Sequence, residues 1–548
     1  MPSDAPPDKR EPTPAPPSAL APLGIPVFRM LWFTWLAANI SMWMNDVAAA
    51  WLMTSLTTSP ILVALVQTAS TLPVFLLGLP SGALADILDR KRFFLLTQLW
   101  VAITALVLCV SVFSGWMSPP LLLALTFANG VGLALRWPVF SAIVPELVPR
   151  EQLPAALALN GVSMNASRII GPLVAGALIA SLGSAYVFML NAALAVVAAV
   201  IISRWDRTPT PHPLGREKLL SAMRVGLQFV AQSTHLHGVF ARICLFFFHS
   251  TALIALLPLL ARGLPGGGAG TFTLMLASMG AGAIVAALMM QRLRQIWSRD
   301  GLVARGAILQ SLAMLAVAYA PNTLVAALAM AVAGAAWITT ANTLSVSAQF
   351  GLPDWVRARG MSMYQMAIMG ASASGAAIWG QVATQYTIRM ALVVAALTGA
   401  VSLLLVNWWM VDNSDEEDQT PSRSFKAPVA KQPPGAGRVV LTIEYKIDPT
   451  RADDFRALMR VSRRSRLRHG ALSWELLREV TDPSRFTEQI VDESWTEHLR
   501  RFDRVTTADA ALRDRKHAFH IGEEPPVVKR RIIENVHGTD TARTMPAD

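Results

Sequence analysis

Stretches of about twenty mostly apolar residues recur along most of this chain, and each is long enough to cross a bilayer core roughly 30 Å thick as one helix. Charged residues are sparse between Phe28 and Val411 and dense after Asp412. We therefore expect an all-α polytopic membrane protein with twelve transmembrane helices, followed by a water-exposed region. The stretches fall near 28–52, 60–85, 93–114, 119–144, 155–181, 184–203, 238–260, 271–291, 302–319, 323–348, 360–385 and 390–411.

Basic residues are concentrated in alternate connections between these stretches. One set carries essentially only Arg262 and Arg389, whereas the other carries Arg90, Lys91, Arg92, Arg150, Arg204, Arg207, Arg216, Lys218, Arg224, Arg292, Arg294, Arg299, Arg357 and Arg359. Cytoplasmic loops are enriched in Lys and Arg. We therefore expect a multi-pass protein of the bacterial inner membrane with both termini cytoplasmic. The same pattern explains the basic net charge of the membrane part without a nucleic acid partner.

The stretch 204–237 is the longest connection, and we interpret it as a cytoplasmic central loop between two six-helix halves, 28–203 and 238–411. One gapless offset of 204 residues relates these halves. It aligns Gly78 with Gly282, Arg90 with Arg294, Gly130 with Gly334, Pro149 with Pro353, Gly171 with Gly375 and Gly176 with Gly380. The sequence therefore predicts two homologous halves, which is an architecture of alternating-access carriers.

The remaining residues have a different composition. Residues 1–27 are rich in Pro and predict a disordered cytoplasmic tail rather than a signal peptide, 412–437 a linker, and 536–548 a second disordered tail. Strand-like and helical patterns alternate over 438–535 in the order βαββαβ, which predicts an α+β ferredoxin-like domain. The two cysteines, Cys109 and Cys244, lie in apolar runs, so we expect no disulfide framework and no metal site.

The segment GALADILDRKR, from Gly82 to Arg92, follows the second apolar stretch. A close-packed glycine, an acidic residue four positions later and a basic cluster predict a charge-switched hinge. Asp86 would pair with a cation or a helix N-terminus in one state and release it in the other. Gly82, Asp86, Arg90, Lys91 and Arg92 are therefore the predicted gating residues. The alternative is that the basic cluster only fixes topology.

This segment resembles the signature of the major facilitator superfamily between its second and third helices. Ile87 stands where a basic residue is usual, and Asp89 where a glycine is usual. With an acidic residue at position 89, the motif resembles that of the enterobactin-exporter-like, or transmembrane secretion effector, branch of the superfamily. NDVAAAWLM from Asn45, TSP from Thr58 and VPELVPRE from Val144 extend the resemblance, which covers about 25–412. It implies a secondary active transporter.

A second motif, RIIGPLVAG, runs from Arg168 to Gly176. Gly171 permits close approach of another helix, and Pro172 frees a backbone carbonyl and kinks its own helix. The motif resembles the fifth-helix signature of antiporters in the same superfamily, which favours export. The alternative role of Gly171, Pro172 and Gly176 is plain packing.

Ionisable residues within lipid are costly, so Asp46, Arg136 and Arg168 are candidates for the transport cavity or for proton coupling. Asp46 could bind a proton or a cationic group, or be a structural carboxylate. Arg168 could hold an anionic solute or a carboxylate, or bond to carbonyls freed by Pro172. Arg136 could instead pair with Glu146 or extend toward the interface.

The C-terminal region resembles the antibiotic-biosynthesis-monooxygenase-like group of dimeric α+β barrels, through HGALSWELLRE from His469 and DESWTEHLRRFDR from Asp492. The resemblance implies a homodimer through this domain, and some members of the group are oxygenases. Trp474, His469, His498 and His517 form no clear catalytic set. We therefore expect a dimerisation or regulatory module, with neither enzyme activity nor a cofactor.

These observations predict a proton-coupled exporter of a siderophore, an antibiotic or a similar small molecule. The cytoplasmic segments contain no GxxxxGK[ST] phosphate-binding loop, so ATP does not drive transport within this chain. Two alternatives stay open. One is a proton-coupled uptake carrier, and the other is a membrane-tethered cofactor-free oxygenase.

Overall fold

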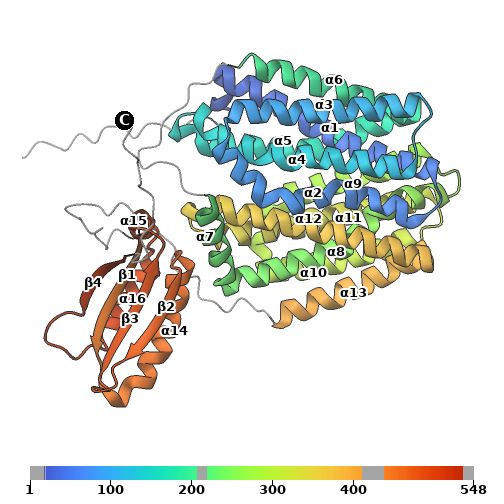
Figure 1. The fold of residues 1–548 in the computed structure, drawn as a ribbon. Coiled ribbons are helices and arrows are strands. Elements are labelled where there is room, and N and C mark those ends of the chain that lie inside the picture. The colour runs from blue at the N-terminus through green and yellow to red at the C-terminus, as the bar shows by residue number, and fades with distance from the viewer. Residues whose placement is uncertain (1–17, 19, 206–218, 410–421, 423–436, 535–548) are drawn as a thin grey trace, which may run out of the picture.

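The computed structural model describes residues 18, 20–205, 219–409, 422 and 437–534. Within them the chain forms a bundle of twelve long helices and a smaller α+β domain at one end of the bundle (Figure 1). The helices are α1 (Pro26–Leu56), α2 (Pro60–Ile87), α3 (Arg90–Phe113), α4 (Pro119–Leu147), α5 (Leu153–Ser181), α6 (Ser184–Ser203), α8 (Thr234–Gly263), α9 (Ala269–Ile296), α10 (Arg299–Ala318), α11 (Thr323–Phe350), α12 (Asp354–Gln385) and α13 (Ile388–Trp409). The predicted fold class is confirmed.

Local chemistry explains where many of these helices begin. Proline occupies the first turn of α1, α2 and α4, where its missing N–H would have no partner in any case. The carboxylate of Asp89 accepts the Arg92 N–H at 2.9 Å and caps α3, and Asn322 caps α11 in the same way. Short 3-10 turns, Ala21–Gly24 and Arg150–Gln152, precede α1 and α5.

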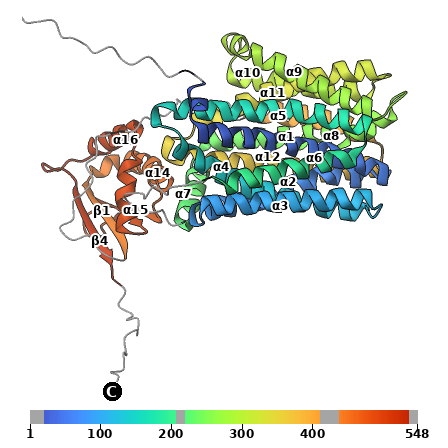
Figure 2. The same cartoon turned by 90° about the horizontal axis from the view of Figure 1, so that it is seen from above.

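Ten of the described helices are long and apolar enough to cross a bilayer by length and composition alone. The other two, α1 and α12, run through the bundle with the rest but carry more polar residues, such as Asn39, Asn45 and Asp46 in α1 (Figure 2). Residues inside a helical bundle can pack against protein rather than lipid, so these helices need less apolar surface.

Helices α1–α6 and α8–α13 form two groups that lie side by side, with α2 against α12 and α5 against α9 (Figure 1). Equivalent glycines occupy equivalent contacts. A Cβ on Gly171 of α5 would lie 3.0 Å from the Ile40 oxygen of α1, and one on Gly375 of α12 would clash with the Phe248 oxygen of α8. These are the same helix pairs in the two halves, as the 204-residue repeat predicts.

The segment expected as a central loop contains an amphipathic helix, α7 (Leu219–Ala231), which the sequence interpretation missed. Val225 and Phe229 are buried, and Gly226 lies against Arg359 and Met363 of α12. Thirteen residues in a polar stretch are too few to stand out as a membrane span, so apolar run length gave no signal here.

The C-terminal domain has a four-stranded antiparallel sheet in the order β2-β3-β1-β4. Its strands are β1 (Arg438–Lys446), β2 (Ser473–Arg478), β3 (Arg485–Asp492) and β4 (Val527–Ile533), and its helices are α14 (Ala452–Arg468), α15 (Trp495–Asp503) and α16 (Thr507–His517), with a 3-10 turn at Pro449–Arg451. Phe455 and Met459 of α14 pack on Leu441 and Ile490 of the sheet. This is the predicted ferredoxin-like order.

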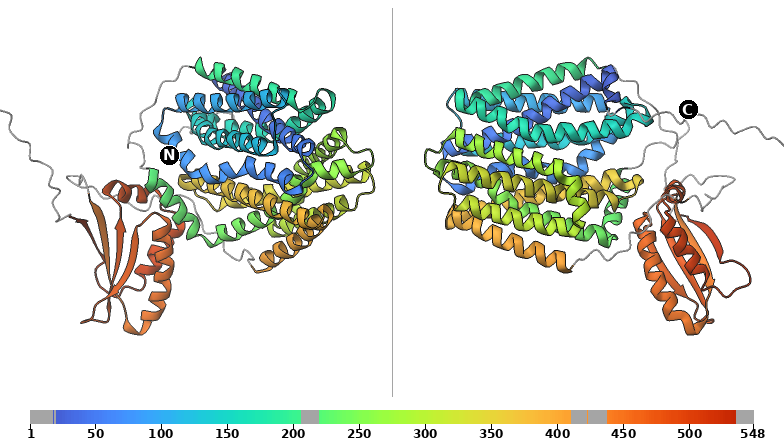
Figure 3. Two further views of the ribbon diagram at one scale, coloured as in Figure 1. Left: turned by 45° about the vertical axis from the view of Figure 1, so that its right-hand side comes forward. Right: turned by 180° about the vertical axis from the view of Figure 1, so that it is seen from behind.

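The domain lies beyond the end of the bundle, beside α7, in every view (Figure 3). Helices α1, α8 and α12 begin at this end of the bundle, and α2, α4 and α11 finish there. This end therefore carries residues 87–90, Arg299 and Arg357. We call it the basic end, and the end that carries Arg262 and Arg389 the opposite end.

Candidate functional site

The junction between the two halves contains an arginine held between aromatic rings. The Arg168 guanidinium of α5 lies over Trp43 of α1, at 5.6 Å, and over Trp337 of α11, at 4.8 Å, so it contacts both halves at once. Arg168 is half-buried, and its buried Nε has no hydrogen-bond partner among the described residues. A partly accessible guanidinium between two indole faces can bind an acidic group that brings a flat apolar part with it.

Asp46 lies one turn from Trp43 on α1. Its Oδ1 accepts the Ser70 hydroxyl of α2 at 2.8 Å, and the side chain is half-buried. No described cation pairs with it. The structure therefore does not join Asp46 and Arg168 as an ion pair, and it leaves a carboxylate within the bundle with a single neutral hydrogen-bond donor.

Arg136 of α4 occupies a different place, inside the first half. Only 1% of its surface is exposed, and it borders a small cavity together with Ser41, Gln98, Asn129 and Asn191. Its guanidinium lies 5.2 Å from the Trp35 ring, and its Nε and Nη2 have no hydrogen-bond partner among the described residues. The pairing with Glu146 considered from sequence is wrong, because Arg136 makes no such contact.

Glu146 instead binds the predicted gating motif. Its Oε1 accepts Arg90 Nη1 at 2.5 Å, which ties the start of α3 to the end of α4. In the second half, the equivalent Arg294 donates to the Asn342 amide oxygen of α11 at 3.1 Å. The backbone of Gly82 and Asp86 belongs to α2, but their side-chain surroundings lie outside the described residues, as do those of Ile87. The hinge therefore stays a prediction.

The helix-5 motif lies where the halves meet. Pro172 is inside α5, Gly171 faces α1, and Gly176 faces Thr273 of α9 so closely that a Cβ there would clash. In the second half, the equivalent Gly380 faces Ile61 and Ala64 of α2. These glycines let α5 and α12 approach the other half closely. Such a close approach fits a packing role, and it also fits two helices that slide past each other.

Contacts between the halves are dense toward the opposite end. Arg262 of α8 donates to the Thr54 carbonyl of α1 and lies 4.9 Å from the Trp51 ring, which stacks on Phe272 of α9. The Thr384 hydroxyl of α12 accepts the Ile61 N–H of α2 at 3.0 Å. These contacts bring α1, α2, α8, α9 and α12 together and close that end of the junction.

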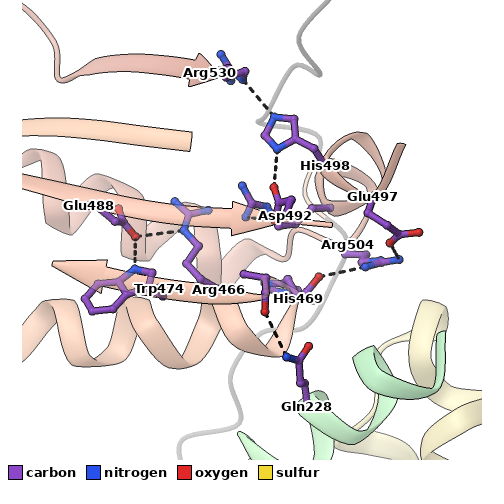
Figure 4. A network of polar contacts seen from close by, with 12 residues as sticks. Gln228, Arg466, His469, Trp474, Glu488, Asp492, Glu497, His498, Arg504 and Arg530 are labelled. Carbon is purple, nitrogen blue, oxygen red and sulfur yellow. Dashed lines mark hydrogen bonds and ion pairs between the residues drawn. The ribbon is translucent and has the colours of Figure 1, made fainter. Parts of the chain in front are cut away.

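In the C-terminal domain His469, His498 and Trp474 lie in structural networks (Figure 4). His498 lies between the Asp492 carboxylate, 2.7 Å from Nδ1, and Arg530, 3.2 Å from Nε2. Burial lowers the pKa of His469 to about 4, although Asp509 at 3.4 Å opposes this shift. Trp474 donates to Glu488 at 2.9 Å.

Glu488 is the buried centre of that second network. Burial raises its pKa, but Lys516 and Arg466 outweigh burial and hold the pKa well below the ordinary glutamate range. The carboxylate therefore stays ionised and serves as a counterion within the domain. This arrangement is what a structural core requires, and it assigns no catalytic pair to Trp474, His469 and His498.

One face of this domain contacts the bundle at the basic end. Arg224 of α7 pairs with Glu493 at 2.8 Å. The Gln228 amide donates to the Ala471 carbonyl at 3.3 Å (Figure 4). The Trp355 ring of α12 lies 6.1 Å from the His469 ring and 5.0 Å from the Arg504 guanidinium. No pattern in the sequence indicates this docking surface, because it depends on α7.

A family model described as transmembrane secretion effector matches residues 17–537 of the chain. Among curated proteins, the chain is 31% identical to the uncharacterized MFS-type transporter YfiS of Bacillus subtilis over 31% of this chain and 41% of that protein. It is 21% identical to the staphyloferrin A transporter of Staphylococcus aureus (59% and 81%) and 28% identical to the enterobactin exporter EntS of Salmonella typhimurium (39% and 51%). The match thus spans less than half the length of YfiS.

Solved structures share the fold of the membrane part. A POT family transporter in complex with 5-aminolevulinic acid matches with a TM-score of 0.58 and 13% identity, over 71% of this chain and 96% of that one. A bacterial homolog of the human lysosomal transporter Spinster, inward-facing and unoccupied, matches with a TM-score of 0.55 and 14% identity, over 70% and 95%. At these identities the likeness concerns the fold alone.

Proposed function

The chain belongs to the transmembrane secretion effector family of the major facilitator superfamily, and we propose that it is a proton-coupled exporter of a small molecule. Proteins described as an enterobactin exporter and a macrolide efflux protein are among its relatives, which supports export over uptake. The arginine-rich loops support a bacterial inner-membrane placement with the basic end and both termini in the cytoplasm.

The observation that carries this proposal is Arg168 between Trp43 and Trp337. A cation bordered by rings from both halves sits where the two halves of an alternating-access carrier hold their solute. The chemistry favours a solute with a carboxylate or another acidic group next to a flat apolar part, such as a siderophore or an aromatic antibiotic. Arg136, enclosed within one half, supports the fold of that half instead.

Alternating access requires the contacts at the opposite end to break. Release outside would follow when Arg262 leaves Thr54 and Trp51 and the α2–α12 and α5–α9 contacts open. The gating motif, Gly82, Asp86, Arg90, Lys91 and Arg92, would close the basic end in that state. Asp46, a carboxylate with one neutral donor, is the proposed proton carrier.

For the C-terminal domain we propose a regulatory or dimerising role rather than catalysis. His498 and Trp474 are committed to structural hydrogen bonds, His469 is buried against Asp509, and the domain is docked on α7 and α12. Self-association of the full chain in detergent, compared with a chain that ends at residue 437, tests the dimer. An unchanged number of chains per particle on removal of the domain would exclude dimerisation through it.

The experiment for the main proposal compares cells and medium. A strain lacking this gene is complemented with the wild type, with Arg168→Gln or with Arg305→Gln. Arg305 also stacks on a tryptophan, Trp297, but near the bundle surface, so it is a matched control. We expect at least one acidic metabolite in the medium with the wild type and Arg305→Gln, and retained in the cell with Arg168→Gln. No difference among the strains would reject the Arg168 site.

A further inference from the structure

The C-terminal domain contains a small cavity between α14 and α16 that the transport function does not use. Four of its ten lining side chains are basic: Arg466, Arg501, Arg513 and Lys516. One lining side chain, Asp509, is acidic. Its Oδ1 accepts the Ser465 hydroxyl, and its Oδ2 accepts the N–H and hydroxyl of Thr506, so its charge is used to cap α16.

The carboxylates behind the cavity leave part of this basic lining without a partner. Glu488 accepts from Lys516 Nζ at 3.1 Å and from Arg466 Nε at 3.4 Å, so one carboxylate serves two cations. Asp492 divides its oxygens between Nη1 of Arg501, at 2.9 Å, and Nδ1 of His498, at 2.7 Å. The Nη groups of Arg466 and the Nε and Nη2 groups of Arg501 have no partner among the described residues, and both side chains line the cavity.

At Arg466 burial is outweighed by Glu488 and the other acidic neighbours, so the pKa of that guanidinium is raised. Burial makes the other two buried cations costly. It lowers the pKa of Lys516 to about 8, although Glu488 opposes the shift, and it lowers the pKa of Arg501 to about 10. A bound anion would offset part of this desolvation and would accept the free N–H groups of Arg466 and Arg501 in charge-assisted hydrogen bonds. A neutral acceptor would satisfy the N–H groups without offsetting the charge, and a cationic occupant would do neither.

We propose that this cavity binds a small oxyanion, the carboxylate or phosphate group of a free solute, between Arg466, Arg501 and Arg513. Arg513 lies at the mouth, where its side chain is 31% exposed and pairs with Asp514 at 3.0 Å. His469 lines the cavity and also contacts Trp355 of α12. The occupant would therefore sit one side chain away from the surface that docks on the membrane helices.

Calorimetric titration of the purified full chain in detergent tests this site, with inorganic phosphate and acetate as separate probes. Arg513→Gln removes the charge at the mouth without disturbing the buried Glu488 network. Arg485→Gln removes an exposed arginine that pairs with Asp482 away from the cavity. Arg168→Gln removes the cation at the junction of the membrane halves, so anion binding there is told apart from binding in the domain.

We expect saturable binding of at least one probe, weakened about tenfold or more by Arg513→Gln and unchanged by Arg485→Gln and Arg168→Gln. The probe that binds identifies the oxyanion class. Absence of saturable binding of both probes would overturn the proposal. Binding that Arg513→Gln leaves intact, or that Arg168→Gln removes, would also overturn it and would leave the transport proposal standing.

Discussion

The gating prediction depends on the negative charge of Asp86, and a substitution can remove that charge while keeping the size of the side chain. Asparagine keeps the size and the hydrogen-bonding capacity of the side chain but removes the charge that a hinge would exchange between partners. We therefore expect Asp86→Asn to abolish export of the solute found in the medium while leaving the amount of membrane-inserted protein unchanged. Export assays and membrane immunoblots measure the two quantities. Normal export by this variant would remove the gating role and leave topology as the motif's function.

His469 makes the stability of the C-terminal domain depend on pH. Its pKa is about 4 when folded and ordinarily 6.5, so between these values the unfolded chain binds a proton that the folded chain does not. Folding stability from this group is thus complete above pH 6.5 and is lost as pH falls toward 4, at no more than about 1.4 kcal/mol per pH unit. Hydrogen exchange of α14 amides, corrected for intrinsic rates, should follow this slope, and His469→Gln should flatten it. Equal slopes in the two proteins would contradict the assignment.

Residue identity alone could not have placed these side chains. Glu146 is near Arg136 along the chain, but it binds Arg90 because the start of α3 and the end of α4 lie at the same side of the bundle. The Trp43–Arg168–Trp337 arrangement depends on which helices meet, and helix spacing within one segment does not carry that information. Asp89 was recognised as unusual in its motif, and its capping of α3 could have been read from the acidic residue just before a helix start.

Helix α12 packs tightly on α8 through Gly375, and a methyl group there would meet the Phe248 carbonyl. Because backbone atoms cannot shift as easily as a side-chain end, Gly375→Ala should lower the thermal stability of the purified protein and reduce export. Gly161→Ala, on the repeat-related α5, meets nothing within 4 Å and serves as the control. Alanine favours helix over glycine by about 1 kcal/mol, so this control should be neutral or slightly stabilising. Equal melting temperatures for the two variants would refute the close contact.

Helix α7 is the element through which the C-terminal domain docks, and its contact has a charge pair that can be exchanged. Arg224→Glu places two carboxylates together, whereas Arg224→Glu with Glu493→Arg restores the attraction. Docking is measured as crosslinking of Gln228→Cys to Ala471→Cys by a short bifunctional thiol reagent, with Cys109 and Cys244 replaced by alanine. Such half-exposed pairs are worth about 1 kcal/mol or less, so we expect a severalfold loss of crosslinking and its recovery in the double exchange. Loss without recovery would mean that the pair does not hold the domain.

At the level of the whole molecule, the sequence predicted the elements far better than the contacts between them. The twelve spans and the βαββαβ order follow from run length and periodicity, which are local signals, and the 204-residue offset predicted the repeated contacts of Gly171 and Gly375. Docking of the domain on α7 and Trp355 is a contact between segments more than a hundred residues apart. No pattern within either segment encodes it, so only the three-dimensional arrangement reveals it.

Directional flux in membrane vesicles decides whether the molecule is an exporter. Everted vesicles expose the basic end to the medium, so the solute identified in the culture medium is supplied on that side and a proton gradient, acidic inside, is imposed. We predict that the wild type accumulates the solute inside these vesicles, that dissipating the gradient stops accumulation, and that Asp46→Asn accumulates none. Gradient-driven accumulation in right-side-out vesicles instead of everted ones would contradict export and establish an uptake carrier.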